Sequence, residues 1–251
     1  MENPWRCSML TYDGDLRPTG ATVSYGSDRF FGTLGAYNIR GDAKIAGSDD
    51  QSLANLFAGQ AGMKYKKDDL SALLALGIFW YDDNTSDFQL GTDDATFHIG
   101  ALYGEVGTKI GAVGIKGIGE VAMNFGADSA YSQGAAYGRA SDDPDAYDPD
   151  DNNLAWLLGA QAKYGKFAAN YAYAYIEGDA IPWFVSDSDF GSGALRASRS
   201  VNVQGHVFGL GYNVTKNFSL GATVMLTECI EPSDDGRDKG QLYQLDASYT
   251  F

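Results

Sequence analysis

Hydrophobic residues fall at every second position in many short stretches of this chain. Residues 241–251 (QLYQLDASYTF) are the clearest case, with Tyr243, Leu245 and Tyr249 in one row and Asp246 in the other. Alternation with a period of two is typical of a β-strand that has one apolar and one polar face. Such a strand would favour aggregation in a soluble protein, whereas a transmembrane β-barrel covers its apolar face with lipid and pairs its edges.

The same alternation, read with the turn signals between the stretches, predicts twelve β-strands. Their ranges are 5–12, 19–26, 29–39, 53–66, 69–81, 95–106, 111–125, 153–164, 167–177, 201–213, 217–227 and 241–251. Tight turns, such as Gly165-Lys166, alternate with long loops at 41–52, 82–94, 126–152, 178–200 and 228–240. Outer-membrane barrels place short turns in the periplasm and long loops outside, and an even number of strands brings both termini to the periplasm. The sequence therefore predicts one domain, residues 1–251, that forms an all-β, antiparallel, up-and-down transmembrane β-barrel.

The polar rows of these strands are rich in Gly, Ala, Ser, Gln and Lys, which suits a hydrated lumen better than a packed core. The register of one strand stays open. In strand 29–39, either Phe30 and Leu34 or Phe31 and Tyr37 can face outward.

The composition agrees with a barrel and argues against a helical membrane protein. The chain has 32 glycines, 16 tyrosines and six prolines, and its mean hydropathy is −0.25. The longest apolar run, Leu70–Tyr81, is shorter than the roughly 18 to 20 residues that a membrane-spanning helix needs. Residues 1–5 lack the basic and apolar regions of a secretory signal, so we expect a mature or engineered chain.

Aromatic residues concentrate near the ends of the predicted strands. Generic β-propensity also enriches aromatic residues in strands but predicts no such concentration, so we interpret them as a membrane girdle. The girdle residues are Tyr65, Trp80, Tyr103, Trp156, Tyr164, Phe167, Tyr212, Phe218 and Phe251.

Two stretches, Asn3–Gly26 (NPWRCSMLTYDGDLRPTGATVSYG) and Gln60–Tyr81 (QAGMKYKKDDLSALLALGIFWY), resemble segments of the bacterial porin family. The strand that ends at Phe251 is similar to the assembly signal of outer-membrane barrels. The resemblance implies a passive solute channel in the bacterial outer membrane, surrounded by lipid, inserted by the barrel assembly machinery and free of cofactors. It also points to a homo-oligomer, because such porins are often trimers, although the sequence shows no interface signature. The chain is short beside porins of about 16 to 18 strands, so a shortened or engineered member is a further interpretation.

The alternation places several charged or titratable residues inside the predicted lumen. Charges there avoid the cost of facing lipid, about 2 to 4 kcal/mol for a basic side chain at the midplane. They can tune ion selectivity, or solvate the interior and pair across strands, and the two roles are compatible. The predicted pore-lining residues are Lys64, Lys116 and Lys163 near the periplasmic turns, Glu120 and Asp246 nearer mid-depth, and His98 near the outer end of its strand.

No catalytic, metal or cofactor site is recognisable. The only imidazoles are His98 and His206, and neither lies in a nucleophile motif, so we predict that the protein is not an enzyme. Cys7 and Cys229 fall at opposite ends of the predicted strands, which argues against a disulfide and favours two isolated thiols.

The net charge of −15 resides largely in the predicted loops, above all in residues 142–151 (DDPDAYDPDD). Nucleic acid is therefore excluded as a partner. An acidic mouth concentrates cations, which predicts a weak cation preference. Calcium binding is the alternative, but the run lacks the spacing of an EF-hand loop, so a solvated loop is preferred.

Loop 178–200 is unusually apolar for a loop and ends in basic residues. Trp183 and Phe184, with Arg196 and Arg199, are candidates for a constriction if the loop folds into the lumen. The alternative is packing against the barrel rim or a neighbouring subunit.

We therefore predict a channel for ions and small hydrophilic solutes. A non-conducting structural or engineered barrel with a filled or capped lumen is the alternative.

Overall fold

The computed structural model describes residues 3–14, 16–40, 53–82, 97–127, 151–183, 185–191, 201–230 and 238–250. These residues form eleven β-strands: β1 (Thr19–Gly26), β2 (Phe30–Arg40), β3 (Leu53–Lys67), β4 (Leu70–Asp82), β5 (His98–Ile110), β6 (Val113–Asn124), β7 (Leu154–Tyr164), β8 (Phe167–Ile176), β9 (Val203–Asn213), β10 (Phe218–Cys229) and β11 (Lys239–Tyr249). Within these ranges, no helix is long and apolar enough to cross a membrane.

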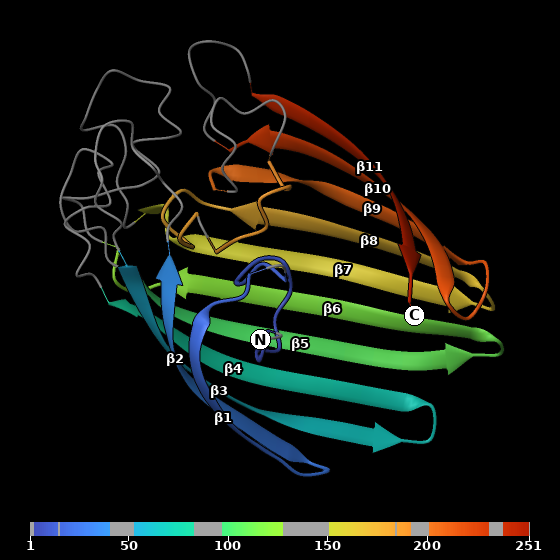
Figure 1. Cartoon of the computed structure of the whole chain (residues 1–251), viewed down its shortest axis with the longest axis horizontal. Helices are drawn as coiled ribbons and strands as arrows, with labels where there is room; N and C mark the ends of the chain where they lie inside the picture. The colour runs from blue at the N-terminus through green and yellow to red at the C-terminus, as the bar shows by residue number, and fades with distance from the viewer. Residues whose placement is uncertain are drawn as a thin grey trace.

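The strands form one antiparallel sheet in which each strand pairs with its neighbours in the chain, from β1 to β11. The sheet curves strongly, so that it has a concave inner face and a convex outer face (Figure 1). The prediction of an all-β, antiparallel, up-and-down topology is confirmed. The sheet is not closed, because no pairing joins β1 to β11 in the described part of the chain. Every neighbouring pair is antiparallel and the described residues form eleven strands, so β1 and β11 run in the same direction.

The prediction of twelve strands is wrong, because residues 5–12 form no strand. Trp5, Leu10 and Tyr12 are buried instead, on the inner side of the sheet. The reason lies in the pattern itself. Trp5 and Met9 belong to one alternating row, while Leu10 and Tyr12 belong to the other, so both rows carry large apolar residues. Such a segment does not suit a strand with one face in water, but it does suit a position enclosed by the rest of the protein.

The outer face exposes one row of large apolar side chains from each strand. Leu245 is 88% exposed, Val23 74% and Leu210 67%. The partner row of each strand faces inward, where cross-strand neighbours such as Gln60 and Gly77 meet. The open register of strand 29–39 is settled by its pairing: Leu34 is exposed on the outer face, while Tyr37 is buried on the inner face.

Short turns join the strands at one rim of the sheet, as Figure 1 shows. Gly111 and Gly165 lie in two of these turns with φ angles of +60° and +56°, a conformation that glycine adopts without strain. β11 ends at the same rim, where Phe218 pairs with Tyr249 and the Asn217 side chain donates to the Thr250 carbonyl at 2.8 Å.

Candidate functional site: the occupied inner face

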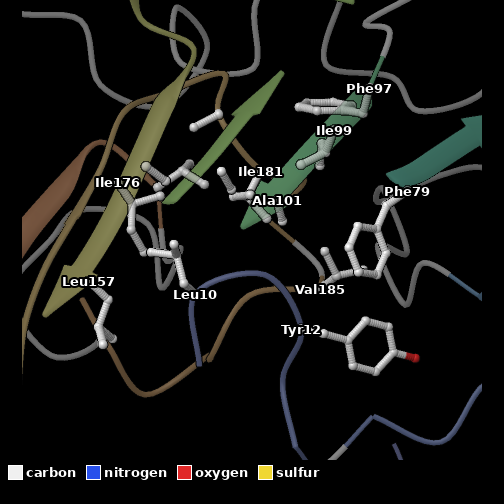
Figure 2. Packing of buried hydrophobic residues seen from close by; sticks show 14 of the residues in the cluster. Leu10, Tyr12, Phe79, Phe97, Ile99, Ala101, Leu157, Ile176, Ile181 and Val185 are labelled. Carbon is white, nitrogen blue, oxygen red and sulfur yellow. The ribbon is translucent and has the colours of Figure 1, made fainter. Parts of the chain in front are cut away.

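Two segments cover the half of the inner face that lies away from the short turns. The N-terminal segment is residues 3–14, and the β8–β9 segment is residues 177–191. Inner-face side chains such as Ile99, Leu157 and Ile176 are fully or nearly fully buried under them. Figure 2 shows Leu10 and Tyr12 of the first segment, with Ile181 and Val185 of the second, gathered against residues of the strands. This half of the concave side is therefore packed like a protein core.

Gln60 of β3 holds the N-terminal segment through its backbone. The Arg6 N–H donates to Oε1 of Gln60 at 2.8 Å, and Nε2 of Gln60 donates to the Arg6 carbonyl oxygen at 2.8 Å. The side-chain amide thus bonds both the N–H and the C=O of Arg6, as a residue of an antiparallel neighbouring strand does. Gln60 is 6% exposed, so both of its polar groups need these partners.

Glu120 of β6 binds the same N-terminal segment further along the chain, at Ser8 and Thr11. Its Oε2 accepts a hydrogen bond from the Ser8 N–H at 2.6 Å, and its Oε1 accepts one from the Thr11 hydroxyl. Glu120 is 4% exposed, and Thr11 is fully buried. Because Glu120 and Gln60 lie on different strands, the two side chains clamp the segment from separate parts of the wall.

Aromatic packing adds to these bonds at the start of the segment. The Trp5 ring meets Tyr37 edge-on at 6.0 Å between centroids and Phe79 at 5.5 Å. Edge-to-face pairs at this spacing contribute roughly 0.5 to 1.5 kcal/mol beyond burial.

The β8–β9 segment packs on the N-terminal segment and on the wall. The Asp13 N–H donates to the Val185 carbonyl at 2.6 Å, and the Asp187 N–H donates to the Met9 carbonyl at 3.4 Å. Nδ2 of Asn124, on the inner face of β6, donates to the Asp179 carbonyl at 2.9 Å. The described part of the predicted loop 178–200 therefore lies against the inner face. Of the predicted constriction residues, Trp183 lies half-buried in this segment, whereas Phe184, Arg196 and Arg199 lie outside the described residues.

Cys7 lies half-buried against this packing. Burial, with a smaller contribution from the charge of Glu120, raises the pKa of the Cys7 thiol to about 12. A thiol with such a pKa is almost entirely protonated at neutral pH and reacts slowly. In the part of the chain that the structure describes, Cys7 and Cys229 form no disulfide.

The half of the inner face next to the short turns is polar and more open. Of the predicted pore-lining residues, Lys64, Lys116, Lys163 and Asp246 lie in this half, and Glu120 lies under the N-terminal segment. The ammonium group of Lys116 pairs with Glu105 at 3.4 Å, and that of Lys64 lies 5.5 Å from the centre of the Phe31 ring.

The sixth predicted pore-lining residue, His98, lies on the outer face, where its ring packs 3.6 Å from that of Trp80. Tyr103, predicted for the girdle, is buried on the inner face and donates a hydrogen bond to Glu105. Both corrections have one cause, because the row of β5 that holds Tyr103 also holds Glu105 and Lys109. Those two charges require that row to avoid the apolar face, a signal that was available in the sequence.

The other predicted girdle residues lie on the outer face, except Phe251, which is outside the described residues. Tyr65, Trp80, Tyr164, Phe167 and Tyr212 are exposed there, and Phe218 is half-exposed. Trp156 packs against Tyr173 at 5.4 Å and Tyr175 at 6.0 Å.

Among the described residues, no group of three His, Cys, Asp or Glu side chains could hold a metal ion. The acidic run 142–151 lies outside the described residues apart from Asp151. Neither the known protein-family models nor the curated proteins give a significant match to this chain.

Proposed function

We propose that the protein is a porin-like β-barrel channel of the bacterial outer membrane, which lets ions and small hydrophilic solutes diffuse passively without a cofactor. The observation that carries the proposal is the contrast between the two faces of the sheet. Large apolar side chains are exposed along the outer face, and lysines and other polar residues line the open half of the inner face.

Lipid is the solvent that suits such an outer face. Soluble monomers rarely expose contiguous apolar patches larger than a few hundred Å². Here Val23 on β1, Ile78 on β4 and Leu245 on β11 are at least 60% exposed, so the apolar surface runs from one edge of the sheet to the other. A bilayer also requires all backbone groups to be paired, which favours closure of the sheet into a barrel. Since β1 and β11 run in the same direction, direct closure would pair them in parallel.

The conduction path runs along the inner face. It is open and polar next to the short turns, and the N-terminal and β8–β9 segments narrow it on the other side. Two side chains, Gln60 and Glu120, make the polar contacts that hold the N-terminal segment on the strands. The N-terminal segment is therefore one of the two elements that narrow the channel, and hydrogen bonds from two wall side chains help to hold it in position.

The channel prefers cations weakly in this proposal. Acidic residues 142–151 concentrate cations at the long-loop mouth, while the lysines of the inner face oppose them near the short turns. The reversal potential in a salt gradient measures the balance, and anion preference would refute this part.

A non-conducting barrel is the second candidate, and the packed half of the inner face favours it. Leu10, Ile181 and Val185 are fully buried, so these segments fill their half of the concave side. If the filling is complete, no continuous water path exists.

Planar-bilayer recording separates the two candidates. The channel predicts stepwise currents from the purified, folded protein, and larger steps from the Gln60→Ala/Glu120→Ala variant, in which the N-terminal segment is released. Gln161→Ala is the matched control, because Gln161 faces inward on β7 and pairs with Lys116 and Asn170 of the neighbouring strands, on the side of the inner face nearer the short turns. Silence from folded wild-type protein and from the double variant would reject the channel.

A further inference from the structure

Three lysines surround Gly114 on the inner face near the short-turn rim. Gly114 of β6 pairs with Lys109 of β5 on one side and with Lys163 of β7 on the other. Lys116 lies two residues further along β6, in the same inward row. Adjacent strands are about 4.8 Å apart, so the Cα atoms of Lys109 and Lys163 are separated by roughly 10 Å. Long lysine side chains can converge over that distance.

The centre of this triad is open space. A Cβ built on Gly114 would meet no atom within 4 Å, and the side chains of Lys109 and Lys163 are exposed. Gly114 thus leaves an open recess between the lysines of its two neighbouring strands. Any side chain larger than hydrogen at this position would occupy the recess.

The positive charge in the recess exceeds the negative charge next to it. Glu105 pairs with Lys116 at 3.4 Å, and in the described part of the chain neither Lys109 nor Lys163 forms an ion pair. Like charges on diagonal cross-strand positions repel one another, so this arrangement is unfavourable unless an anion or solvent compensates it.

We propose that Lys109, Lys116 and Lys163 form a binding site for a small doubly charged oxyanion of the phosphate type. Ammonium groups bind phosphate oxygens as compact point charges, and three of them around one recess can contact different oxygens of the same group. In the proposed channel the site lies at the short-turn mouth, so its role in admitting phosphorylated or inorganic phosphate solutes rests on the proposed function. The binding itself does not.

Inorganic phosphate is the probe, and the folded full-length protein in detergent micelles is titrated by calorimetry at constant ionic strength. Saturable binding is expected, and Lys109→Gln/Lys163→Gln should raise the Kd at least tenfold. The matched control, Lys64→Gln/Lys66→Gln, removes the same charge from the inner row of β3 and should change the Kd less than twofold. Glu105→Gln frees Lys116 and should tighten binding severalfold.

Absence of saturable phosphate binding would overturn the proposal. Equal losses in the two double variants would also overturn it, because they would reduce the effect to the general field of the wall. Phosphate binding by a protein that gives no current would reject the channel and leave the site intact. Currents from a protein that binds no phosphate would reject the phosphate site and leave the channel intact.

Discussion

Replacing Glu120 by alanine should release the N-terminal segment from the inner face. The substitution removes the acceptor of two hydrogen bonds, from the Ser8 N–H at 2.6 Å and from the Thr11 hydroxyl, and leaves a half-buried and a fully buried donor without this acceptor. Each such loss costs about 1 to 1.5 kcal/mol, so the docked state of the segment should lose about 2 to 3 kcal/mol. At about 1.4 kcal/mol per factor of ten, the undocked population should rise roughly 30- to 150-fold.

The reaction of Cys7 with a maleimide measures this population. Burial raises the pKa of the docked thiol to about 12, whereas an unperturbed cysteine has a pKa of about 8.5, so at pH 8 the thiol reacts far faster in the undocked state than in the docked state. When docking is fast compared with alkylation, the rate is proportional to the undocked population. Cys229→Ser in every variant leaves Cys7 as the single thiol.

Two control variants distinguish release of the N-terminal segment from other effects on the reaction rate of Cys7. Glu120→Gln removes the charge that helps to raise the pKa of Cys7 but keeps an acceptor for the Ser8 N–H, so the rate should rise only a few-fold. Gln161→Ala should leave the rate within about twofold of wild type. A Glu120→Ala rate that matches either wild type or Glu120→Gln would refute the reasoning.

Three further predictions follow from the same structure. Burial raises the pKa of Asp187, so the docked β8–β9 segment binds a proton more tightly than the undocked one; its docking should weaken as pH rises from about 4 through the raised pKa. Hydrogen exchange of residues 177–191 against pH should show this, and Asp187→Asn should abolish it. Trp5→Ala should destabilise the folded protein by about 3 to 5 kcal/mol in a denaturant titration, whereas Tyr12→Phe should be nearly neutral because the Tyr12 hydroxyl has no hydrogen-bond partner in the described structure. Leu245→Lys should cost about 2 to 4 kcal/mol of stability in bilayers, and equal costs for Leu245→Lys and its inward neighbour Asp246→Lys would contradict the assignment of faces.

The local alternation of apolar and polar residues is enough to predict most of the strands. β1 occupies residues 19–26 in the structure as in the prediction, and the other ten strands agree within a few residues at each end. A period of two and the residues of a tight turn are properties of short stretches, so they can be read without the rest of the chain. The inward face of β5 is also indicated by the sequence, because Glu105 and Lys109 stand in the same alternating row as Tyr103 and a charged row does not face lipid.

The packing of the two segments on the inner face could not be predicted from local alternation. Its hydrogen bonds join Arg6 to Gln60, 54 residues away, and Ser8 to Glu120, 112 residues away. No periodic signal links such positions, because the contacts depend on the curvature of the whole sheet. Large apolar residues stand in both alternating rows of residues 5–12, but nothing in that pattern identifies the wall residues that hold the segment.

The central claim is that the outer face of the sheet meets lipid while the inner face meets water. A spin-label scan along β11 in lipid vesicles tests it directly, with one label at a time from residue 241 to residue 249. Collisions with oxygen, which dissolves in lipid, should peak at Tyr243, Leu245 and Ala247, and collisions with a water-soluble nickel complex should peak at Gln244 and Asp246. Equal accessibility of both rows to the nickel complex would contradict the account.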